Sequence, residues 1–468
     1  MNTPIYNKLK ELDSEKRIPF HMPGHKRTDF GAFFGIEKMD ITEITDYDNL
    51  HEPEGIIRES MDLVKDIFKS TESWYLVGGS TLGILVSISS VCKPGDKILI
   101  GRNCHKAVYN CIRLLQLEAV YCYADISQKY DVCVDMKPEM VEKKLKENPE
   151  IKAVVLTSPT YEGVVSDIKG IKKTIQPYGI PLIVDEAHGA HFNFHDKFPE
   201  SAVKRGADAV IQSIHKTLPS FTQTALLHLN GNLIDKDRVK KYWNIYQSTS
   251  PSYILMAGIS RCLTFLEDNM CDSVSSGYMD EYVFRLTNLR KEIKKLKYIK
   301  LQEVDDISKI VLVVNDGKNL YDKLLNDYGI QLEMASVNYC IAMTSVGDKQ
   351  VYYDRFIEAL RELDTPENEY SGSYSPALVK AVVALNMYEA DSCDNETVNI
   401  RDSIGHIAAS NICFYPPGIN LVNAGEVVTQ EVIDVIKDGL GHGLSAIGVE
   451  KAADGSTLIK CVKQRTVL

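Results

Sequence analysis

Short apolar segments alternate with helical patterns through the first half of the chain. These segments lie at residues 74–77, 96–100, 118–123, 152–156, 180–184 and 209–211. Continuous apolar runs of this length are typical of strands buried on both faces of a parallel sheet. Helical patterns at residues 82–91 and 137–148 separate some of them. The alternation from residue 74 to 229 therefore predicts a doubly wound α/β domain.

The second half of the chain has a different pattern. Long helical patterns at residues 253–268 and 281–297 precede two strand patterns at 310–314 and 339–343, and the polar stretch 364–375 resembles a linker. We therefore predict four units: an N-terminal segment over 1–60, a large domain over 61–275, a small α/β domain over 276–365 and an α+β C-terminal domain over 366–468.

Composition limits the partners and the compartment. The chain has 53 Lys and Arg against 64 Asp and Glu, a net charge of -11, which argues against nucleic acid or an anionic membrane as main partner. The first 26 residues do not resemble a signal peptide, and the longest apolar candidate, residues 82–92, is shorter than a membrane helix. The 11 cysteines form no Cys-x-x-Cys pair. These features predict a cytoplasmic protein with reduced thiols.

Two neighbouring strand ends carry the most informative chemistry. The run at 180–184 ends at Asp185, and the run at 209–211 is followed by Ser213, His215 and Lys216. Open α/β sheets bind ligands at the carboxyl ends of their strands. A pyridoxal 5'-phosphate (PLP) enzyme needs a lysine for its Schiff base and an acid that keeps the pyridine nitrogen protonated. Either segment alone is equally consistent with an ordinary strand end, but together they favour PLP.

Two further segments fit the same cofactor. The strand at 74–77 is followed by Gly78-Gly79-Ser80-Thr81 and a helical pattern, an arrangement that holds phosphate on backbone N–H groups at a helix N-terminus. A plain turn is the alternative. His105 follows the strand at 96–100, where it would either lie over a cofactor ring or cap the next helix.

Histidines near Asp185 raise the alternative of a zinc site. Histidines and a carboxylate can together bind zinc. The spacing His-x-x-His-x-x-x-His, however, does not match the helical His-Glu-x-x-His motif. Non-helical residues between the histidines argue against one continuous helix. We therefore expect no metal site at His188, His191 and His195.

Seven ordered motifs carry a resemblance to a known family. They lie at 22–26 (Met-Pro-Gly-His-Lys), 79–81 (Gly-Ser-Thr), 102–106 (Arg-Asn-Cys-His-Lys), 158–161 (Ser-Pro-Thr-Tyr), 185–191 (Asp-Glu-Ala-His-Gly-Ala-His), 215–216 (His-Lys) and 415–419 (Tyr-Pro-Pro-Gly-Ile). With these motifs, the chain resembles the short bacterial ornithine/lysine/arginine decarboxylases, which lack the N-terminal wing domain of the large enzymes. The resemblance implies the aspartate-aminotransferase fold (PLP fold type I), with a mainly parallel large domain and smaller α+β C-terminal domains.

The resemblance also implies roles for individual residues. Lys216 would form the Schiff base, Asp185 would pair with the pyridine nitrogen, and His105 would stack on the ring. The residues around the phosphate would be Ser80, Thr81, Ser213 and His215. Those beneath the ring, or near its oxygen and the substrate carboxylate, would be Ala187, His188 and Thr160.

The implied activity is decarboxylation of lysine, ornithine or arginine to the amine and CO2. Family members are typically dimers with shared active sites, so the turn at 22–26 and the loop at 415–426 would lie near the partner, and Glu426 is a candidate for binding the substrate's distal cation. The C-terminal motif departs from the family pattern: residues 405–410 read Gly-His-Ile-Ala-Ala-Ser instead of Gly-Arg-Ile-x-Ala-Glu. Another PLP reaction, such as transamination or elimination, and a catalytically silent PLP-binding protein therefore remain alternatives.

Overall fold

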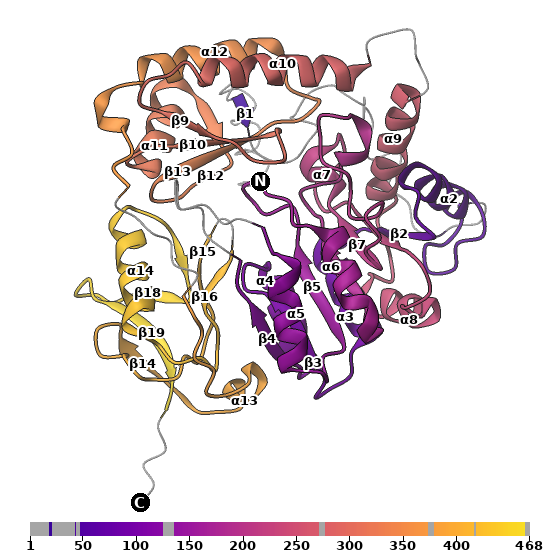
Figure 1. Ribbon diagram of the computed structural model, residues 1–468, viewed down its shortest axis with the longest axis horizontal. Coiled ribbons are helices and arrows are strands. Elements are labelled where there is room, and N and C mark those ends of the chain that lie inside the picture. Colours follow the sequence, from indigo (N-terminus) through magenta and orange to yellow (C-terminus); the bar gives the residue numbers. More distant parts are fainter. Residues whose placement is uncertain are drawn as a thin grey trace, which may run out of the picture.

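A seven-stranded sheet organises the large domain of the computed structural model, which describes residues 18–20, 43, 47–124, 135–270, 277–372, 379–415 and 418–463. The strand order is β2-β8-β7-β6-β5-β3-β4 (Figure 1). The bounds are β2 Glu72–Leu76, β3 Lys97–Gly101, β4 Glu118–Cys122, β5 Ala153–Thr157, β6 Leu182–Asp185, β7 Ala209–Gln212 and β8 Ala225–Leu229. β8 runs antiparallel to both of its neighbours, and the other paired strands are parallel. The predicted mainly parallel sheet is present.

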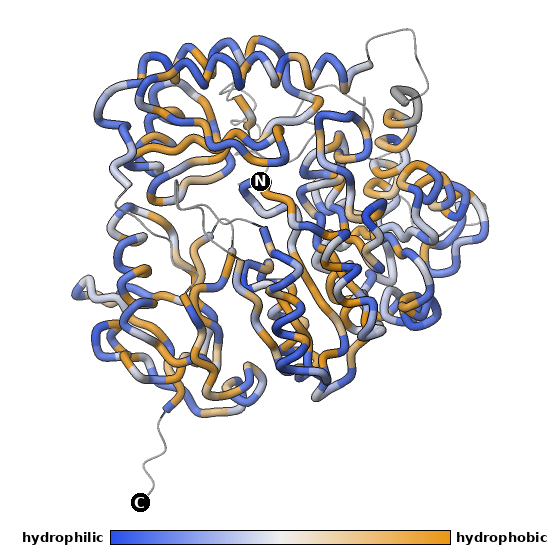
Figure 2. Tube along the Cα trace, in the orientation of Figure 1, coloured by the Kyte–Doolittle hydropathy of each residue, from blue (hydrophilic) through white to orange (hydrophobic). Residues whose placement is uncertain are grey.

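Helices cover both faces of this sheet because side chains of each strand point alternately to the two sides. In β3, Ile98 and Ile100 belong to one buried cluster and Leu99 to another. The first cluster packs under α2, α3, α4, α8 and α9, and the second under α5 and α6. The helices are α2 Ile56–Phe68, α3 Gly79–Val91, α4 Lys106–Leu114, α5 Pro138–Glu147, α6 Ile168–Ile175, α8 Lys236–Tyr246 and α9 Tyr253–Met270. Apolar residues colour the strands orange along their length in Figure 2.

The small domain has a four-stranded antiparallel sheet of order β12-β13-β10-β9. Its strands are β9 Lys300–Gln302, β10 Lys309–Val313, β12 Met334–Ala335 and β13 Tyr339–Met343, and its helices are α10 Tyr278–Ile293, α11 Gly317–Tyr328 and α12 Gln350–Glu362. The N-terminal segment contributes β1 Ile18–Phe20, which pairs in parallel with β11 Ile330–Leu332. Buried Ile18 and Phe20 anchor β1 in the small-domain core. The predicted turn at 22–26 lies outside the described residues.

The C-terminal domain contains two three-stranded sheets, β14-β19-β18 and β16-β15-β17. Its elements are α13 Met387–Asp391, β14 Asn395–Asn399, β15 Ile412–Phe414, β16 Asn420–Val422, α14 Gln430–Gly441, β17 Ala446–Ile447, β18 Val449–Lys451 and β19 Thr457–Val462. An isolated β-bridge joins Ile419 of this domain to His105 of the large domain. The C-terminal domain therefore reaches the carboxyl edge of the large sheet.

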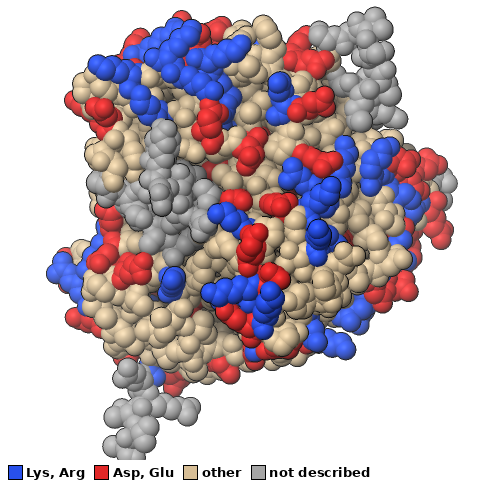
Figure 3. All heavy atoms as spheres, in the orientation of Figure 1, with Lys and Arg blue, Asp and Glu red and all other residues tan. Residues whose placement is uncertain are grey.

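Charged side chains of both signs are interspersed on the face shown in Figure 3. The basic side chains that gather near the top of this view lie over α10 and α12, where Lys295 and Arg361 are both paired with Glu292. This face therefore carries mixed charge rather than one large basic surface. Separately, none of the helices in the described part of the chain is both long and apolar enough to span a membrane.

Candidate active site

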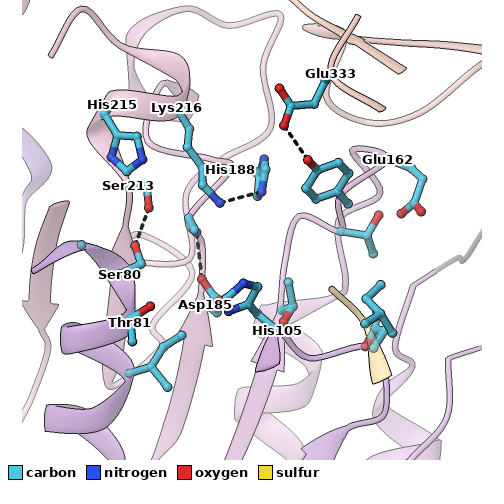
Figure 4. Close-up of a pocket in the computed structure, with 18 of the residues that line it drawn as sticks. Ser80, Thr81, His105, Glu162, Asp185, His188, Ser213, His215, Lys216 and Glu333 are labelled. Carbon is cyan, nitrogen blue, oxygen red and sulfur yellow. Dashed lines mark hydrogen bonds between the residues drawn. The ribbon is translucent and has the colours of Figure 1, made fainter. Parts of the chain in front are cut away.

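A cavity of about 290 Å³ lies at the carboxyl ends of β3, β5, β6 and β7 (Figure 4). Its position is the one where open α/β sheets bind ligands. Every residue that the sequence assigned to the cofactor lines it: Ser80, Thr81, His105, Thr160, Asp185, Ala187, His188, Ser213, His215 and Lys216. Side chains from five separated segments thus meet in one cavity.

Lys216 lies in the middle of the cavity, on the short helix α7 Ile214–Thr217 that directly follows β7. Its Nζ is 2.9 Å from Nε2 of His188. Burial lowers the pKa of Lys216, while the charges of Asp185 and Glu333 raise it. Burial also lowers the pKa of His188 well below its usual range, so the imidazole is neutral and accepts the hydrogen bond. A lysine with a lowered pKa is suited to act as a nucleophile.

Asp185 ends β6 and is 4% exposed. Its Oδ1 accepts a hydrogen bond from the Ala187 N–H at 3.1 Å. Burial raises the pKa of Asp185, and the Lys216 ammonium and the Ala187 N–H act in the opposite direction. Because a buried carboxylate is costly without a cationic partner, this position favours a ligand that presents a protonated nitrogen.

His105 caps the N-terminus of α4, where its Nδ1 accepts a hydrogen bond from the Ala107 N–H at 3.2 Å. The capping role considered for this histidine is therefore present. Burial, with smaller contributions from Lys216 and Lys106, lowers the pKa of His105 to about 4. The ring is neutral at pH 7 and lies beside Asp185 in the cavity wall (Figure 4), so capping and stacking on a cofactor ring are compatible.

Hydroxyl groups and a helix N-terminus meet at one end of the cavity. Ser80 and Thr81 lie in the first turn of α3, and Ser80 Oγ is 2.6 Å from Ser213 Oγ. Gly79 has φ +72, a left-handed conformation that glycine adopts without strain. The Nδ1–H of His215 donates to the Thr224 carbonyl at 2.7 Å, which fixes that ring. This end can bind an anion such as phosphate on free N–H groups and hydroxyls.

The sequence profile of the major domain of the Orn/Lys/Arg decarboxylases matches residues 3–350, and the profile of their C-terminal domain matches residues 375–438. The chain belongs to this family. It is an enzyme of a decarboxylase family, and the predicted family and enzyme class are confirmed.

Named relatives agree with the family assignment. The chain is 33% identical to the uncharacterized protein YaaO of Bacillus subtilis, over 92% of this chain and 93% of that protein. It is 29% identical to a Bacillus subtilis arginine decarboxylase, over 100% of this chain and 99% of the relative. A solved Francisella novicida lysine decarboxylase superposes with a TM-score of 0.79 at 19% identity, covering 94% of this chain and 77% of that one. This likeness confirms the predicted fold class.

Sequence reasoning missed Glu333, which the small domain contributes to this decarboxylase-family site. The residue lies between β11 and β12, and its Oε1 accepts a 2.6 Å hydrogen bond from the Tyr161 hydroxyl. The two residues are 172 positions apart, and no local motif marks Glu333. Glu162 and Asn103 also line the cavity without having been singled out.

Glu426 is not among the residues that line the cavity of one chain, and its predicted contact with the substrate stays a prediction. Glu426 is 2% exposed, and its two carboxylate oxygens accept hydrogen bonds from the Arg102 guanidinium at 2.6 and 2.8 Å. Arg102 also donates to the Leu421 carbonyl at 3.0 Å. Because Arg102 already neutralises this acid, the pair instead fixes the C-terminal domain to the end of β3.

Arg102→Met or Glu426→Gln is expected to lower the free energy of unfolding by about 3–5 kcal/mol, because each leaves one buried charge without its partner. The double variant Arg102→Met/Glu426→Met should recover part of this loss. Urea unfolding followed by circular dichroism measures the effect, with Lys146→Gln at an exposed ion pair as control. Single variants as stable as the control would contradict the proposed anchoring.

The histidines considered for zinc are bound to different partners. His188 contacts Lys216, His191 Nε2 lies 3.1 Å from Asp306 Oδ1, and His195 Nε2 lies 3.3 Å from an oxygen of Asp280. Within the described ranges, no group of three or more His, Cys, Asp or Glu side chains is arranged to hold a metal ion.

Proposed function

We propose that this chain catalyses the PLP-dependent decarboxylation of lysine, ornithine or arginine. The observation that carries the proposal is the juxtaposition of Lys216 and Asp185 at the sheet edge, beside an anion-binding helix end, in a member of the Orn/Lys/Arg decarboxylase family. A lysine, a buried acid and a phosphate site in one cavity are the groups that PLP requires.

The residues of the cavity fit PLP in chemical type and order. Ser80, Thr81 and Ser213 would hold the phosphate at the α3 N-terminus, with His215 beside them. In the described part of the chain, the buried Nδ1 of His188 has no hydrogen-bond partner, so a polar ligand group can satisfy it. His105 and Ala187 would contact the ring, and Thr160, which also lines the cavity, would contact its oxygen or the substrate carboxylate.

PLP, when bound, supplies an electron sink for the bond that breaks at the substrate's α carbon. The chain supplies orientation and proton control. Lys216 would hold the cofactor covalently until the substrate amine replaces it, and its released amine would then deliver a proton to the α carbon. His188, 2.9 Å from Lys216 Nζ, would accept a hydrogen bond from that amine and so orient it. Asp185 would keep the pyridine nitrogen protonated by its negative charge.

Product analysis tests this proposal. Purified protein with added PLP should release CO2 from at least one of the three amino acids and form cadaverine, putrescine or agmatine in equal amount. Because residues 405–410 differ from the family motif, transamination remains the second candidate. Transamination would give a 2-oxo acid without CO2. A 2-oxo acid or ammonia as main product, or no turnover with any of the three, would refute the decarboxylase assignment.

We also propose a cytoplasmic homodimer with shared active sites. Tyr415, in the cavity wall, is 50% exposed, which leaves a partner chain access to this part of the site. Sedimentation velocity of the active enzyme should therefore give a dimer or a larger even-numbered assembly. A fully active monomer would contradict shared sites.

A further inference from the structure

The cavity has an acidic end opposite its phosphate-binding end. In Figure 4, Ser80, Thr81 and Ser213 lie on one side of Lys216, whereas Glu333 and Glu162 lie on the other. An amino acid whose α carbon is held near Lys216, with its side chain directed away from the phosphate, would extend toward these acids. The two ends therefore differ in the charge of the group that each can accept.

Glu333 is held in a defined orientation. The Tyr161 hydroxyl donates to its Oε1 at 2.6 Å, and the Tyr161 ring packs edge-on against the His188 ring with 4.8 Å between centroids. His188 in turn contacts Lys216 Nζ. A chain of direct contacts thus joins the Glu333 carboxylate to the reacting lysine, although the acid comes from the small domain.

The charge of Glu333 acts inside the cavity. It raises the pKa of Lys216, against the effect of burial. It also adds to the burial that raises the pKa of Tyr161, so the phenol stays protonated and keeps donating. Glu162 differs, because burial raises the pKa of its carboxyl group and so disfavours its charged form, although the Tyr339 hydroxyl at the start of β13 also donates to it at 2.9 Å.

Space continues beyond Glu333. A second cavity of about 230 Å³ shares Glu333 and Tyr415 with the first and is lined further by Lys318, Tyr321 and Phe414. Glu333 therefore lies at the boundary of the two cavities. A substrate side chain that reaches this boundary can end at the Glu333 carboxylate, or it can extend a bulkier planar group into the second cavity.

We propose that Glu333, oriented by Tyr161, binds the distal ammonium or guanidinium group of the substrate and so selects cationic amino acids. This inference rests on the proposed function, because it assumes that the substrate amine reacts at Lys216. The carboxylate would form a charge-assisted hydrogen bond with the distal cation. The other two acids are less suited to this role, because Arg102 already neutralises Glu426 and burial raises the pKa of Glu162.

The decisive variant is Glu333→Gln, which keeps an oxygen that can accept from Tyr161 but removes the charge. With PLP-loaded enzyme, KM for the best basic substrate is expected to rise about 10- to 100-fold, the effect of losing a hydrogen bond to a charged group. The preference for that substrate over its neutral analogue, such as norleucine for lysine or citrulline for arginine, should fall by a similar factor. Glu162→Gln is the matched control and should change this preference far less.

Binding of the amine products separates this inference from the proposed function. Calorimetric titration of cofactor-free protein with agmatine, cadaverine and putrescine requires no turnover. Wild-type protein should bind at least one of them, and Glu333→Gln should weaken that binding about 10-fold or more. Unchanged binding and substrate preference in Glu333→Gln, or no amine binding by the wild type, would overturn the role of Glu333. Wild-type CO2 release would still support the proposed function in those cases.

Discussion

Lys216→Ala enzyme is expected to lose turnover by about 1,000-fold or more and to lose every covalent link to PLP. The first effect follows because Lys216 Nζ is the amine in the cavity that is placed both to hold the cofactor and to move the proton, and positioned proton transfer alone contributes about 100- to 10,000-fold. The second follows because α7 presents Lys216 into the cavity beside His188.

The absorbance of the bound cofactor and borohydride reduction of its link to the protein test this expectation. Wild-type protein should be yellow, absorbing at roughly 420 nm as expected for a protonated Schiff base of the cofactor. Borohydride treatment followed by mass spectrometry should attach the cofactor to the peptide that contains Lys216. Lys169→Ala, at an exposed position on α6, is the control and should keep the colour. A borohydride-reducible link that persists in Lys216→Ala would refute the assignment.

The sequence could bring the expected cofactor residues into one cavity because they follow the ends of buried strands. Asp185 ends β6 and Lys216 follows β7, and these strands are parallel neighbours, so their carboxyl ends meet at one sheet edge. Ser80 and Thr81 follow β2 in the same way. Local patterns of apolar runs and strand ends are sufficient for such residues.

Glu333 and Glu426 could not be placed in this way, because their roles depend on packing between domains. Glu333 reaches the cavity only when the small domain is packed against Tyr161. Glu426 resembled a functional acid on a loop, yet Arg102, 324 positions earlier, neutralises it. A sequence pattern shows the charge of a residue but not which distant side chain will neutralise it.

The fold likewise has features that local patterns predict and features that depend on tertiary packing. The buried parallel strands appear as continuous apolar runs, whereas β8 runs antiparallel between β2 and β7, a direction that its apolar run alone cannot show. β1 is similar: Ile18 and Phe20 form a strand only because β11 offers an edge in the small domain. Strand direction and pairing depend on tertiary contacts that residue patterns do not encode.

Asp185→Asn is expected to reduce turnover by about 100-fold or more while weakening retention of the cofactor much less. Asparagine nearly preserves the shape and can still accept from the Ala187 N–H, but it removes the negative charge that stabilises a proton on the pyridine nitrogen. Loss of one preorganised electrostatic group in an active site costs about 100- to 1,000-fold in rate.

Glu186→Gln provides the matched control for Asp185→Asn, because the neighbouring carboxyl group points to a different set of partners. Glu186 accepts hydrogen bonds from Ser201, Ala202 and Gln212, and burial raises its pKa to about 7. Its amide variant should alter stability more than turnover. Steady-state kinetics and the fraction of PLP that remains after gel filtration distinguish the two variants. Near-normal turnover in Asp185→Asn, or an equally large loss in Glu186→Gln, would show that the Asp185 charge does not sustain the reaction.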